Sequence, residues 1–332
     1  MERPIVALVL AGGTGTRLYP ASRTDRPKQF LSFGGEQSLL KNTVDRADFA
    51  EETYVLTQAA FADEIHDHAP EAAVLTEPAP RDTGPALVYG AHRVREQVGE
   101  CVLLVLPSDH VVGDGFRRVA EQAARVAVAT EGLVTLGIEP TRPEPGYGYI
   151  EPGAARDGYQ TVAQFHEKPD RATAETYLDR GCYWNAGMFA WTPAALLSAA
   201  RSSPLEPLVG ALDRGDPVAG FEAIEPISID YAVLERADSV AVVPADFEWD
   251  DLGAWDALAR HLPTDDAGNA VMGEATAIDA RSNVVATDGH VSLVGVEDLV
   301  VASFDDRTLV VPTEQAQRVR AVVSRLREQD RF

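Results

Sequence analysis

The first half of the chain alternates short apolar runs with segments of helical spacing. Each apolar run is continuous, without polar residues at every second position. Continuous apolar strands that are separated by helices are typical of a parallel sheet covered on both faces. The expected strands are 5–11, 53–57, 72–78, 101–112 and 133–138, and the expected helices are 38–47, 85–97 and 116–130.

The pattern changes near residue 139. Residues 139–159 (EPTRPEPGYGYIEPGAARDGY) are rich in Pro, Gly and Tyr, which indicates long loops and antiparallel hairpins. Strands at 161–169 and 188–192 then flank a helix at 171–180. The expected fold is therefore α/β, with a Rossmann-like, mixed but mostly parallel sheet. Ligands of such sheets bind beyond the carboxyl ends of the strands, where the loop after residue 11 and the segment LPSDH both lie.

The last part of the chain predicts a small β-rich domain. Residues 268–312 form short apolar runs that are broken by Gly, Asp and Asn. One amphipathic helix follows at 313–329, with Thr313 as its expected N-cap. Its expected apolar face consists of Ala316, Val319, Val323 and Leu326. We therefore expect two domains, 1–262 and 263–332.

Composition excludes several classes of protein. The formal charge of −23 argues against a nucleic-acid partner, because such proteins need a basic face. The sequence holds no apolar run of about 18 residues and no signal-peptide pattern, so we expect a cytoplasmic protein without a membrane partner. Cys101 and Cys182 lack metal-site spacing, which favours two thiols in a reducing compartment.

Lysine is scarce in this chain. Its 29 basic residues include only three lysines, Lys28, Lys41 and Lys168. An acidic surface with few lysines resembles the proteins of salt-loving organisms, and we state a halophilic origin as a hypothesis. Where lysine is rare, each remaining lysine is also a better candidate for a function.

The loop after the first strand, AGGTGTR, fits neither of two common phosphate-binding patterns. The dinucleotide pattern fits Gly13 and Gly15 but meets Leu18 in place of its third glycine. The P-loop pattern fits Gly12 but meets Arg17 and Leu18 in place of Gly and Lys. A strand-to-helix turn without a ligand is the alternative for the three glycines alone.

The charges that follow the loop favour a phosphate ligand. Glycines let backbone N–H groups approach a polyphosphate, and Arg17 can bind a phosphate with two N–H groups. Lys28 can place a positive charge where negative charge develops, and Pro27 stiffens the chain beside it. A glycine loop, an arginine and a Pro-Lys pair together indicate a nucleotidyl-transfer site.

These residues also carry a family resemblance. GGTGTRLYPASRTDRPKQFL (12–31) resembles the signature of sugar-nucleotide pyrophosphorylases, and RPKQFL resembles the mannose-1-phosphate guanylyltransferases in particular. Seven further blocks resemble this family in the same order: EPAPRDTGPA (77–86), LPSDH (106–110), GYGYIE (146–151), FHEKPD (165–170), YWNAGMF (183–189), SIDYAVLE (228–235) and WDDLGAW (249–255). The resemblance implies a GT-A-like catalytic domain with a β-helix-like C-terminal domain, in the short form without a fused isomerase.

The resemblance implies attack by the phosphate of mannose 1-phosphate on the α-phosphorus of GTP, which yields GDP-mannose and diphosphate. The attacking group is already anionic, so positioning and charge neutralisation carry the catalysis. The implied catalytic residues are Arg17, Lys28, Asp109 and Lys168, and the implied Mg²⁺ ligands are Asp109 and Asp251. The implied nucleotide-binding residues are Leu10, Ala11, Gly12, Gly13, Thr14, Gly15, Thr16, Arg17, Lys28, Glu77, Arg81, Asp82, Pro85 and Ser108. The implied sugar-phosphate-binding residues are Gly146, Tyr147, Glu167, Lys168, Asn185 and Asp230.

Some of these positions leave alternatives open. Asp250 stands where the family has a small polar residue, so either Asp250 or Asp251 can coordinate the metal. Asp82 replaces the usual asparagine and loses its N–H donor, and Arg81 pairs with it or approaches a phosphate. We expect structural or supporting roles for the bulky or titratable residues His110, His166 and Trp184. From the family we expect a homodimer. The alternatives to the implied activity are a transferase for another base or hexose and an inactive regulatory homologue.

Overall fold

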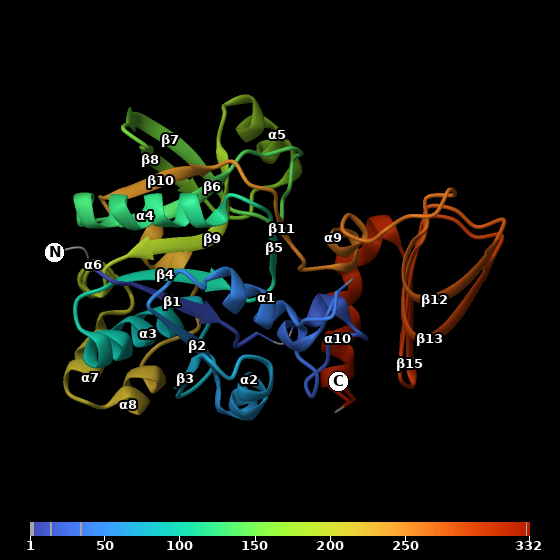
Figure 1. Ribbon diagram of the computed structural model, residues 1–332, viewed down its shortest axis with the longest axis horizontal. Helices are drawn as coiled ribbons and strands as arrows, with labels where there is room; N and C mark the ends of the chain where they lie inside the picture. Colours follow the sequence, from blue (N-terminus) through green and yellow to red (C-terminus); the bar gives the residue numbers. More distant parts are fainter. Residues whose placement is uncertain (1–2, 14, 34, 330) are drawn as a thin grey trace. The chain divides into compact units, whose positions relative to one another are not determined.

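The computed structural model describes residues 3–13, 15–33, 35–329 and 331–332 (Figure 1). The chain forms two compact units that interleave along the sequence. The first unit comprises 1–12, 44–107 and 112–249, and the second unit comprises 13–43, 108–111 and 250–332. Thr14, one of the expected nucleotide-binding residues, lies outside the described residues.

The first unit is built on a nine-stranded sheet of order β3-β2-β1-β4-β9-β6-β10-β8-β7. Pairing is parallel from β3 to β4 and between β6 and β10, whereas β9 runs antiparallel to β4 and β6, and β8 antiparallel to β10 and β7. This mixed α/β architecture confirms the predicted fold class. The strands are β1 (Ile5–Leu10), β2 (Glu52–Gln58), β3 (Ala73–Glu77), β4 (Val102–Pro107), β6 (Leu133–Ile138), β7 (Tyr149–Arg156), β8 (Tyr159–His166), β9 (Tyr183–Trp191) and β10 (Val240–Ala245).

The expectation of one strand over 101–112 is wrong. β4 ends at Pro107, and a separate strand, β5 (His110–Val112), pairs with β11 (Trp249–Asp251). Proline has no backbone N–H to continue a ladder, so the chain leaves the large sheet there. The break puts Ser108 and Asp109 on a turn at the carboxyl end of β4.

Helices pack on both faces of the large sheet. Buried residues of α3, α6 and α7 share one apolar cluster with Val6 and Leu8 of β1, while α4 packs on β4, β6, β9 and β10 with its buried side chains outside that cluster. None of the helices in the described ranges is long and apolar enough to cross a membrane. The helices of this unit are α2 (Ala62–His68), α3 (Thr83–Val98), α4 (Phe116–Thr130), α5 (Arg171–Asp179), α6 (Pro193–Arg201), α7 (Glu206–Asp213) and α8 (Pro217–Glu222).

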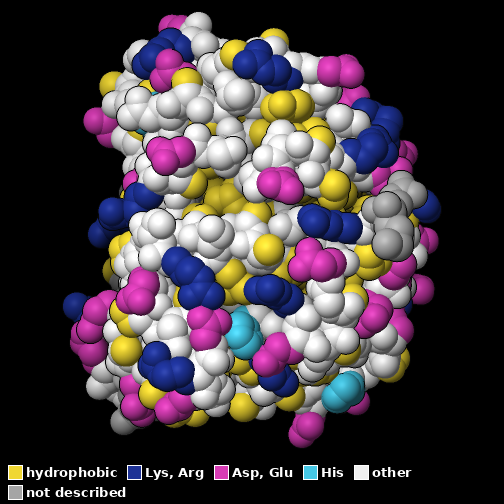
Figure 2. All heavy atoms as spheres, turned by 90° about the vertical axis from the view of Figure 1, so that its left-hand side faces the viewer, with side chains coloured by type: hydrophobic (Ala, Val, Ile, Leu, Met, Phe, Trp, Pro, Cys, Tyr) yellow, Lys and Arg dark blue, Asp and Glu magenta, His cyan; other side chains and the backbone are white. Residues whose placement is uncertain are grey.

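The surface charges are mixed on the face drawn in Figure 2. Basic side chains stand singly or in small groups there, with acidic and apolar side chains between them. On that face neither sign of charge gathers into one large patch.

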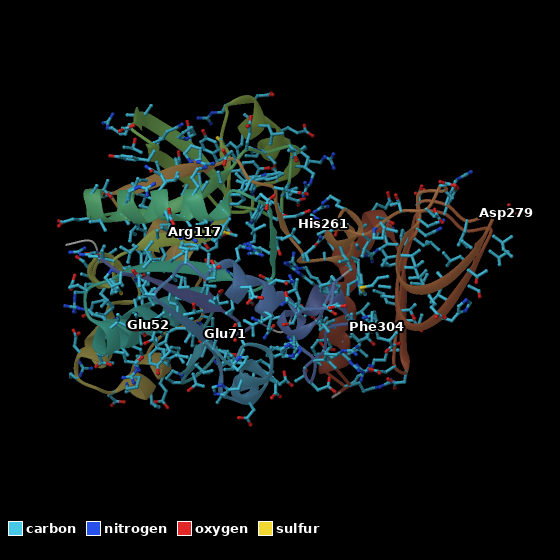
Figure 3. All side chains as sticks on the ribbon, viewed as in Figure 1. Glu52, Glu71, Arg117, His261, Asp279 and Phe304 are labelled. Carbon is cyan, nitrogen blue, oxygen red and sulfur yellow. The ribbon has the colours of Figure 1, made fainter. Side chains whose placement is uncertain are left out.

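The second unit joins the loop segment after β1 to the C-terminal part of the chain. Its core holds Leu18, Trp255, Phe304 and Val319 in one apolar cluster, and Figure 3 marks Phe304 and His261 among its side chains. The helix α1 (Leu39–Arg46) leads the chain back to the first unit. The other elements are η1 (Thr16–Leu18), η2 (Lys28–Phe30), α9 (Trp255–Ala259), β12 (Ala270–Ile278), β13 (Val284–Val294), β14 (Leu299–Phe304), β15 (Arg307–Pro312), η5 (Thr313–Arg318) and α10 (Val319–Arg327).

Successive coils of the C-terminal strands stack on a ladder of asparagines. β12, β13 and β14 pair in parallel, and β15 closes the sheet antiparallel. The buried Asn269 Oδ1 accepts hydrogen bonds from the backbone N and Nδ2 of Asn283 at 3.1 and 2.9 Å. Asn283 Oδ1 in turn accepts from Leu299 N at 3.1 Å. The asparagine of each coil therefore accepts hydrogen bonds from the next coil. This stacking is the β-helix-like arrangement that was predicted.

The C-terminal helix begins later than expected, and the predicted N-cap is wrong. Residues 313–318 form the 3₁₀ helix η5, and α10 starts only at Val319. The Thr313 hydroxyl is buried and finds no hydrogen-bond partner, while its amide donates to Asp298 O at 2.9 Å. The apolar face is confirmed, because Ala316, Val319 and Val323 are buried and the partly buried Leu326 packs against the same cluster.

No single position along the sequence divides the two compact units. The segment 13–43 belongs to the second unit although it precedes most of the large sheet. The boundary after residue 262 stays a prediction.

Candidate functional site

The glycine loop starts from backbone that β2 holds in place. Ala11 N donates to Leu56 O at 2.9 Å, and Ala11 O accepts from Thr57 Oγ1 at 2.9 Å. Gln58 Nε2 donates to Gly12 O. Leu10, Ala11 and Gly12 therefore form a fixed end of β1, and Gly13 beyond them is exposed with open space at its Cα.

Gly15 is a glycine because the loop lies against the stem of Lys28. Its φ of +64° falls in the left-handed region, and a Cβ on it would lie 2.4 Å from Lys28 Cβ. No side chain fits at that separation. The glycine thus brings Thr16 and Arg17, in η1, close to the lysine that follows Pro27.

Lys28 is buried and faces two carboxylates. Its side chain is 3% exposed, and its Nζ lies 2.8 Å from Asp109 Oδ2 and 3.5 Å from Asp251 Oδ1. Burial alone raises the pKa of Asp109, but Lys28, together with His110 and Arg17, outweighs this effect and the pKa falls to about 2. Both aspartates thus meet one shared cation, so the carboxylates expected from the sequence do lie together.

Arg17 joins the same group of charges. Its Nη2 lies 3.8 Å from Asp251 Oδ2. Gly253 leaves the space for this pair, because a Cβ there would lie 2.5 Å from Arg17 Nη2 and 2.9 Å from Asp251 Oδ2. The sequence interpretation missed Gly253, although the glycine directly after the Asp-Asp-Leu segment was the available signal.

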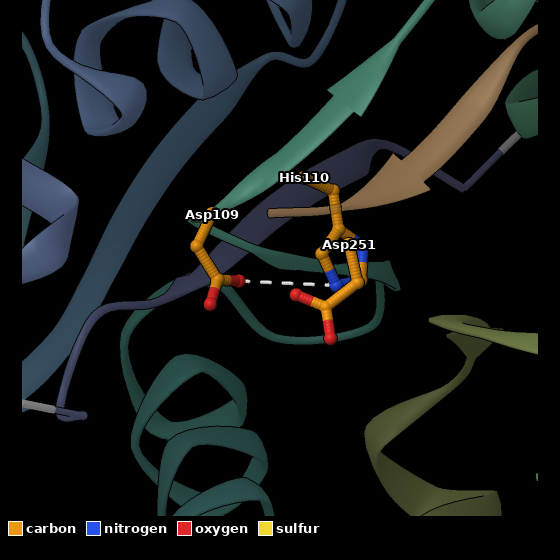
Figure 4. Close-up of side chains that lie close together, drawn as sticks. All are labelled: Asp109, His110 and Asp251. Atoms are coloured by element: carbon orange, nitrogen blue, oxygen red, sulfur yellow. Dashed lines mark ion pairs between the residues drawn. The ribbon is translucent and has the colours of Figure 1, made fainter. Parts of the chain in front are cut away.

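Asp109, His110 and Asp251 can hold a metal ion. One donor atom from each of them lies within 4.8 Å of the other two. Figure 4 shows the two carboxylates beside one another with His110 adjacent, and its dashed line marks the pair between His110 Nε2 and Asp109 Oδ1, which are 3.8 Å apart. Carboxylate oxygens suit a hard divalent cation, whose remaining ligands in proteins are commonly water and phosphate oxygens.

Asp250 points away from this group and has a structural role. Arg260 donates to both of its carboxylate oxygens, at 2.7 and 2.8 Å, and His261 Nε2 lies 3.0 Å from Oδ2. Neighbouring residues on a strand point to opposite sides, so only one of the two aspartates of β11 can face Asp109. That residue is Asp251.

The first unit holds a second polar group around Asn185 on β9. Asn185 Oδ1 accepts from Thr135 Oγ1 at 3.0 Å and from Gly187 N at 3.1 Å, and its Nδ2 donates to Asp230 Oδ1 at 2.9 Å. The amide is thereby fixed in one orientation. Burial, followed by the nearby Glu167, raises the pKa of Asp230 to about 7.

Glu167 and Lys168 adjoin Asn185 and Asp230. The Glu167 side chain is 5% exposed and that of Lys168 56% exposed, and the two form an ion pair. A Cβ on Gly148 would lie 2.5 Å from Glu167 Oε2 and 3.4 Å from Asn185 Cβ. Gly148 therefore leaves room beside these side chains, whereas Gly146 is exposed and faces Glu144.

Aromatic side chains border this group. Tyr147 packs edge-on against Trp184 and Trp249, with ring centroids 5.3 and 5.1 Å apart. Trp184 is buried, as a packing role requires. His166 stacks on Tyr177 at 4.4 Å, and its Nε2 lies 3.5 Å from Glu151 Oε2, which are structural contacts.

Glu77, the first residue of the stretch 77–86, lies next to the fixed end of β1. A Cβ on Gly12 would lie 3.2 Å from Glu77 Oε1, so the glycine makes room for this carboxyl group. Burial raises the pKa of Glu77 to about 7. Asp82 has a φ of +69°, and its carboxylate accepts from Thr83 N at 2.7 Å at the start of α3. Asparagine and aspartate both accept the hydrogen bond of a helix cap, so the exchange preserves this contact.

The other expected nucleotide-binding residues, Arg81, Pro85 and Ser108, lie at the ends of secondary-structure elements or in the turns beside them. Arg81 O accepts from Ile227 N at 3.2 Å, Pro85 is buried in the first turn of α3, and Ser108 is buried on the turn after β4. Gly13 to Lys28, Ser108, Asp109 and Asp251 belong to the second unit. Leu10 to Gly12, residues 77–85 and the group around Asn185 belong to the first unit.

Two families match consecutive parts of the chain. The nucleotidyl transferase family matches residues 6–267. The family described as a MannoseP isomerase/GMP-like beta-helix domain matches residues 273–326.

Known proteins resemble almost the whole chain. It is 36% identical over 351 residues to the xanthan biosynthesis protein XanB of Xanthomonas campestris pv. campestris (strain B100), covering 98% of this chain and 74% of that protein. It is 36% identical over 355 residues to the mannose-1-phosphate guanylyltransferase of Klebsiella pneumoniae, covering 98% and 75%. The solved mannose-1-phosphate geranyltransferase from Thermus thermophilus matches with a TM-score of 0.91 and 38% identity, covering 98% and 99% of the two chains.

Proposed function

Because this chain belongs to the nucleotidyl transferase family, we propose that it transfers a guanylyl group from GTP to mannose 1-phosphate, forming GDP-mannose and diphosphate. The family matches confirm the resemblance and the enzyme class that were predicted from the sequence. The choice of guanine and mannose is the proposal.

One observation carries the proposal: a buried lysine faces two carboxylates beside a glycine loop. In the reaction an oxygen of the sugar phosphate bonds to the α-phosphorus of GTP, and the bond from that phosphorus to the β-phosphate oxygen breaks. The attacking oxygen is already anionic, so no side chain has to remove a proton. Catalysis then depends on holding two anionic substrates and neutralising the charge that develops.

The residues of the second unit provide this neutralisation. We propose that Lys28 faces the transferred phosphate and that Arg17 binds the departing diphosphate. Asp109 and Asp251 would hold Mg²⁺, which when bound polarises phosphate oxygens and offsets their negative charge. With these carboxylates engaged by a cation, the positive groups of Lys28 and Arg17 are released toward phosphate.

Guanine selection is assigned to the stretch 77–86, which begins at the last residue of β3. Guanine presents N1–H and N2–H₂ as neighbouring donors, and an ionised carboxylate accepts both. Glu77 adjoins Gly12 at the fixed end of β1 and has its carboxylate available, whereas the Asp82 carboxylate is engaged in the helix cap. We therefore assign the base contact to Glu77.

Mannose recognition is assigned to the group around Asn185. Glu167 and Asn185 offer hydrogen bonds to sugar hydroxyls, Asp230 fixes Asn185, and Gly148 leaves room beside them. Lys168, whose side chain is more than half exposed, is assigned to the phosphate of the sugar phosphate. Gly146 and Tyr147 remain expected members of this site.

A panel assay tests the proposal. Diphosphate release is measured for GTP, ATP, UTP and dTTP, each with mannose 1-phosphate and glucose 1-phosphate, with and without Mg²⁺. We expect the highest kcat/KM for GTP with mannose 1-phosphate and no turnover without a divalent cation. A higher kcat/KM for another base or hexose would assign this chain to a different sugar-nucleotide product.

Three expectations stay predictions: localisation in the cytoplasm, assembly as a homodimer and a requirement for salt. The last is tested by repeating the assay and thermal unfolding in rising KCl. A stability that does not change with KCl would contradict the halophilic hypothesis.

A further inference from the structure

The C-terminal helix α10 packs against the short helix that carries Arg17. Val319 and Val323 of α10 lie in the same apolar cluster as Leu18 of η1, and all three are at most 2% exposed. Arg17 directly precedes Leu18, and Arg320 directly follows Val319. The packing therefore fixes the starting points of two arginine side chains near each other.

The electrostatics of Arg320 agree with this placement. Partial burial lowers the pKa of Arg320, the charge of Arg17 lowers it further, and the charge of Asp251 raises it. Arg320 is thus a third cation near Asp251 and Arg17, which belong to the same group of charges as Lys28 and Asp109.

This group has more positive than negative side chains. Three cations face two carboxylates, and each of the carboxylates is already paired with Lys28. Arg320 forms no ion pair with any residue that the structure describes, and its side chain is exposed. Two like charges near each other repel, and a polyanion between them removes that repulsion. A divalent cation on the carboxylates increases the positive excess further.

We propose that Arg320 binds the diphosphate group, as the β- and γ-phosphates of GTP and as the departing product, together with Arg17. This inference rests on the proposed function and adds a residue from the C-terminal helix to its binding site. It also gives the packing of α10 on η1 a functional purpose, because that packing holds both arginines.

The test compares Arg320→Ala, Arg320→Lys and Arg325→Ala with the wild-type full chain. Arg325 lies on the same helix, five residues and about 140° around the axis from Arg320, so its variant is the matched control. Binding of inorganic diphosphate in the presence of Mg²⁺ is measured by calorimetry, without sugar or nucleotide. We expect Arg320→Ala to weaken binding about tenfold, which corresponds to about 1.4 kcal/mol, Arg320→Lys to weaken it less, and Arg325→Ala to bind like the wild type.

Kinetics of the reverse reaction separate binding from a structural effect. We expect Arg320→Ala to raise the KM for diphosphate about tenfold, with the KM for GDP-mannose and the melting temperature unchanged. If Arg320→Ala fails to fold, Arg320→Lys and Arg320→Gln carry the same comparison. Wild-type diphosphate affinity in a folded Arg320 variant would overturn the inference. A wild-type chain that binds diphosphate through Arg320 but forms no GDP-mannose would overturn only the proposed function.

Discussion

Lys28 Nζ lies 2.8 Å from Asp109 Oδ2, and this pair is the centre of the candidate site. The lysine is almost wholly buried, and its second carboxylate neighbour, Asp251, is 3.5 Å away. The Lys28 charge helps to hold the pKa of Asp109 well below its ordinary value, so this carboxylate stays ionised. The arrangement places the Lys28 ammonium next to the two aspartates that are assigned as ligands of a metal ion.

Removing the lysine charge should abolish most of the activity. We expect Lys28→Ala to lower kcat by a factor on the order of 10²–10³, because a preorganised charge at the transferred phosphate is lost. Circular dichroism should show the wild-type secondary structure. Lys41→Ala, which removes another of the three lysines, is the control. Wild-type turnover in Lys28→Ala would remove Lys28 from catalysis.

The two neighbouring aspartates of β11 should behave differently. Asp250→Ala deprives Arg260 and His261 of their shared partner, so we expect a loss of about 1.5–3 kcal/mol in unfolding free energy. Asp251→Ala should keep the melting temperature close to that of the wild type but lose Mg²⁺ binding and turnover. Calorimetric Mg²⁺ titration and thermal unfolding of both variants check this. Retained Mg²⁺ binding in Asp251→Ala would contradict the assignment.

Substitutions at two glycines of the loop, Gly15 and Gly13, should have different effects on stability. Gly15→Ala puts a methyl group 2.4 Å from Lys28 Cβ at a φ of +64°, so we expect lower stability and lower turnover together. Gly13→Ala meets no atom within 4 Å, so its melting temperature should match that of the wild type. Its KM for GTP should rise if the backbone lies close to phosphate. Equal melting temperatures for both variants would contradict the loop geometry.

Glu77 should make GTP binding depend on pH. Burial raises the pKa of Glu77 to about 7 from its ordinary value of 4.5, so the folded chain binds this proton more tightly than the unfolded chain. Its contribution to stability is therefore full below about pH 4.5 and is lost as the pH rises through about 7. Because only the ionised carboxylate accepts both guanine donors, the KM for GTP should fall between about pH 6 and about pH 8.

The matched variants for this prediction are Glu77→Gln and Glu71→Gln. Glu77→Gln should remove the pH dependence of the GTP KM and of the stability over that range. Glu71, which is exposed and is marked in Figure 3, should leave both unchanged when it is replaced. A pH dependence that persists in Glu77→Gln would assign the base contact to another group.

The strand and helix order of the first unit follows from hydrophobic pattern alone, because buried parallel strands are continuous apolar runs. The break between Pro107 and His110 was not predicted, since an apolar run continues on both sides of it. The segments that form α6, α7 and α8 were not predicted as helices.

The residues of the candidate site were easier to predict than their orientation. Lys28, Asp109 and Asp251 stand in motifs, but only the strand geometry shows that Asp250 turns toward Arg260. Gly253 and Arg320 were missed because a glycine acts through the space it leaves, and a helical arginine through packing that sequence spacing does not reveal. The asparagine ladder had a signal, since Asn269 and Asn283 each precede an apolar strand at a spacing of 14 residues.

Product analysis by phosphorus NMR tests guanylyl transfer most directly. The wild-type chain is incubated with GTP, mannose 1-phosphate and Mg²⁺, at low salt and in molar KCl. We expect GDP-mannose and diphosphate to appear in equal amounts, and neither to appear when the divalent cation is removed by a chelator. The absence of GDP-mannose at both salt concentrations, with the chain folded, would contradict the proposed function.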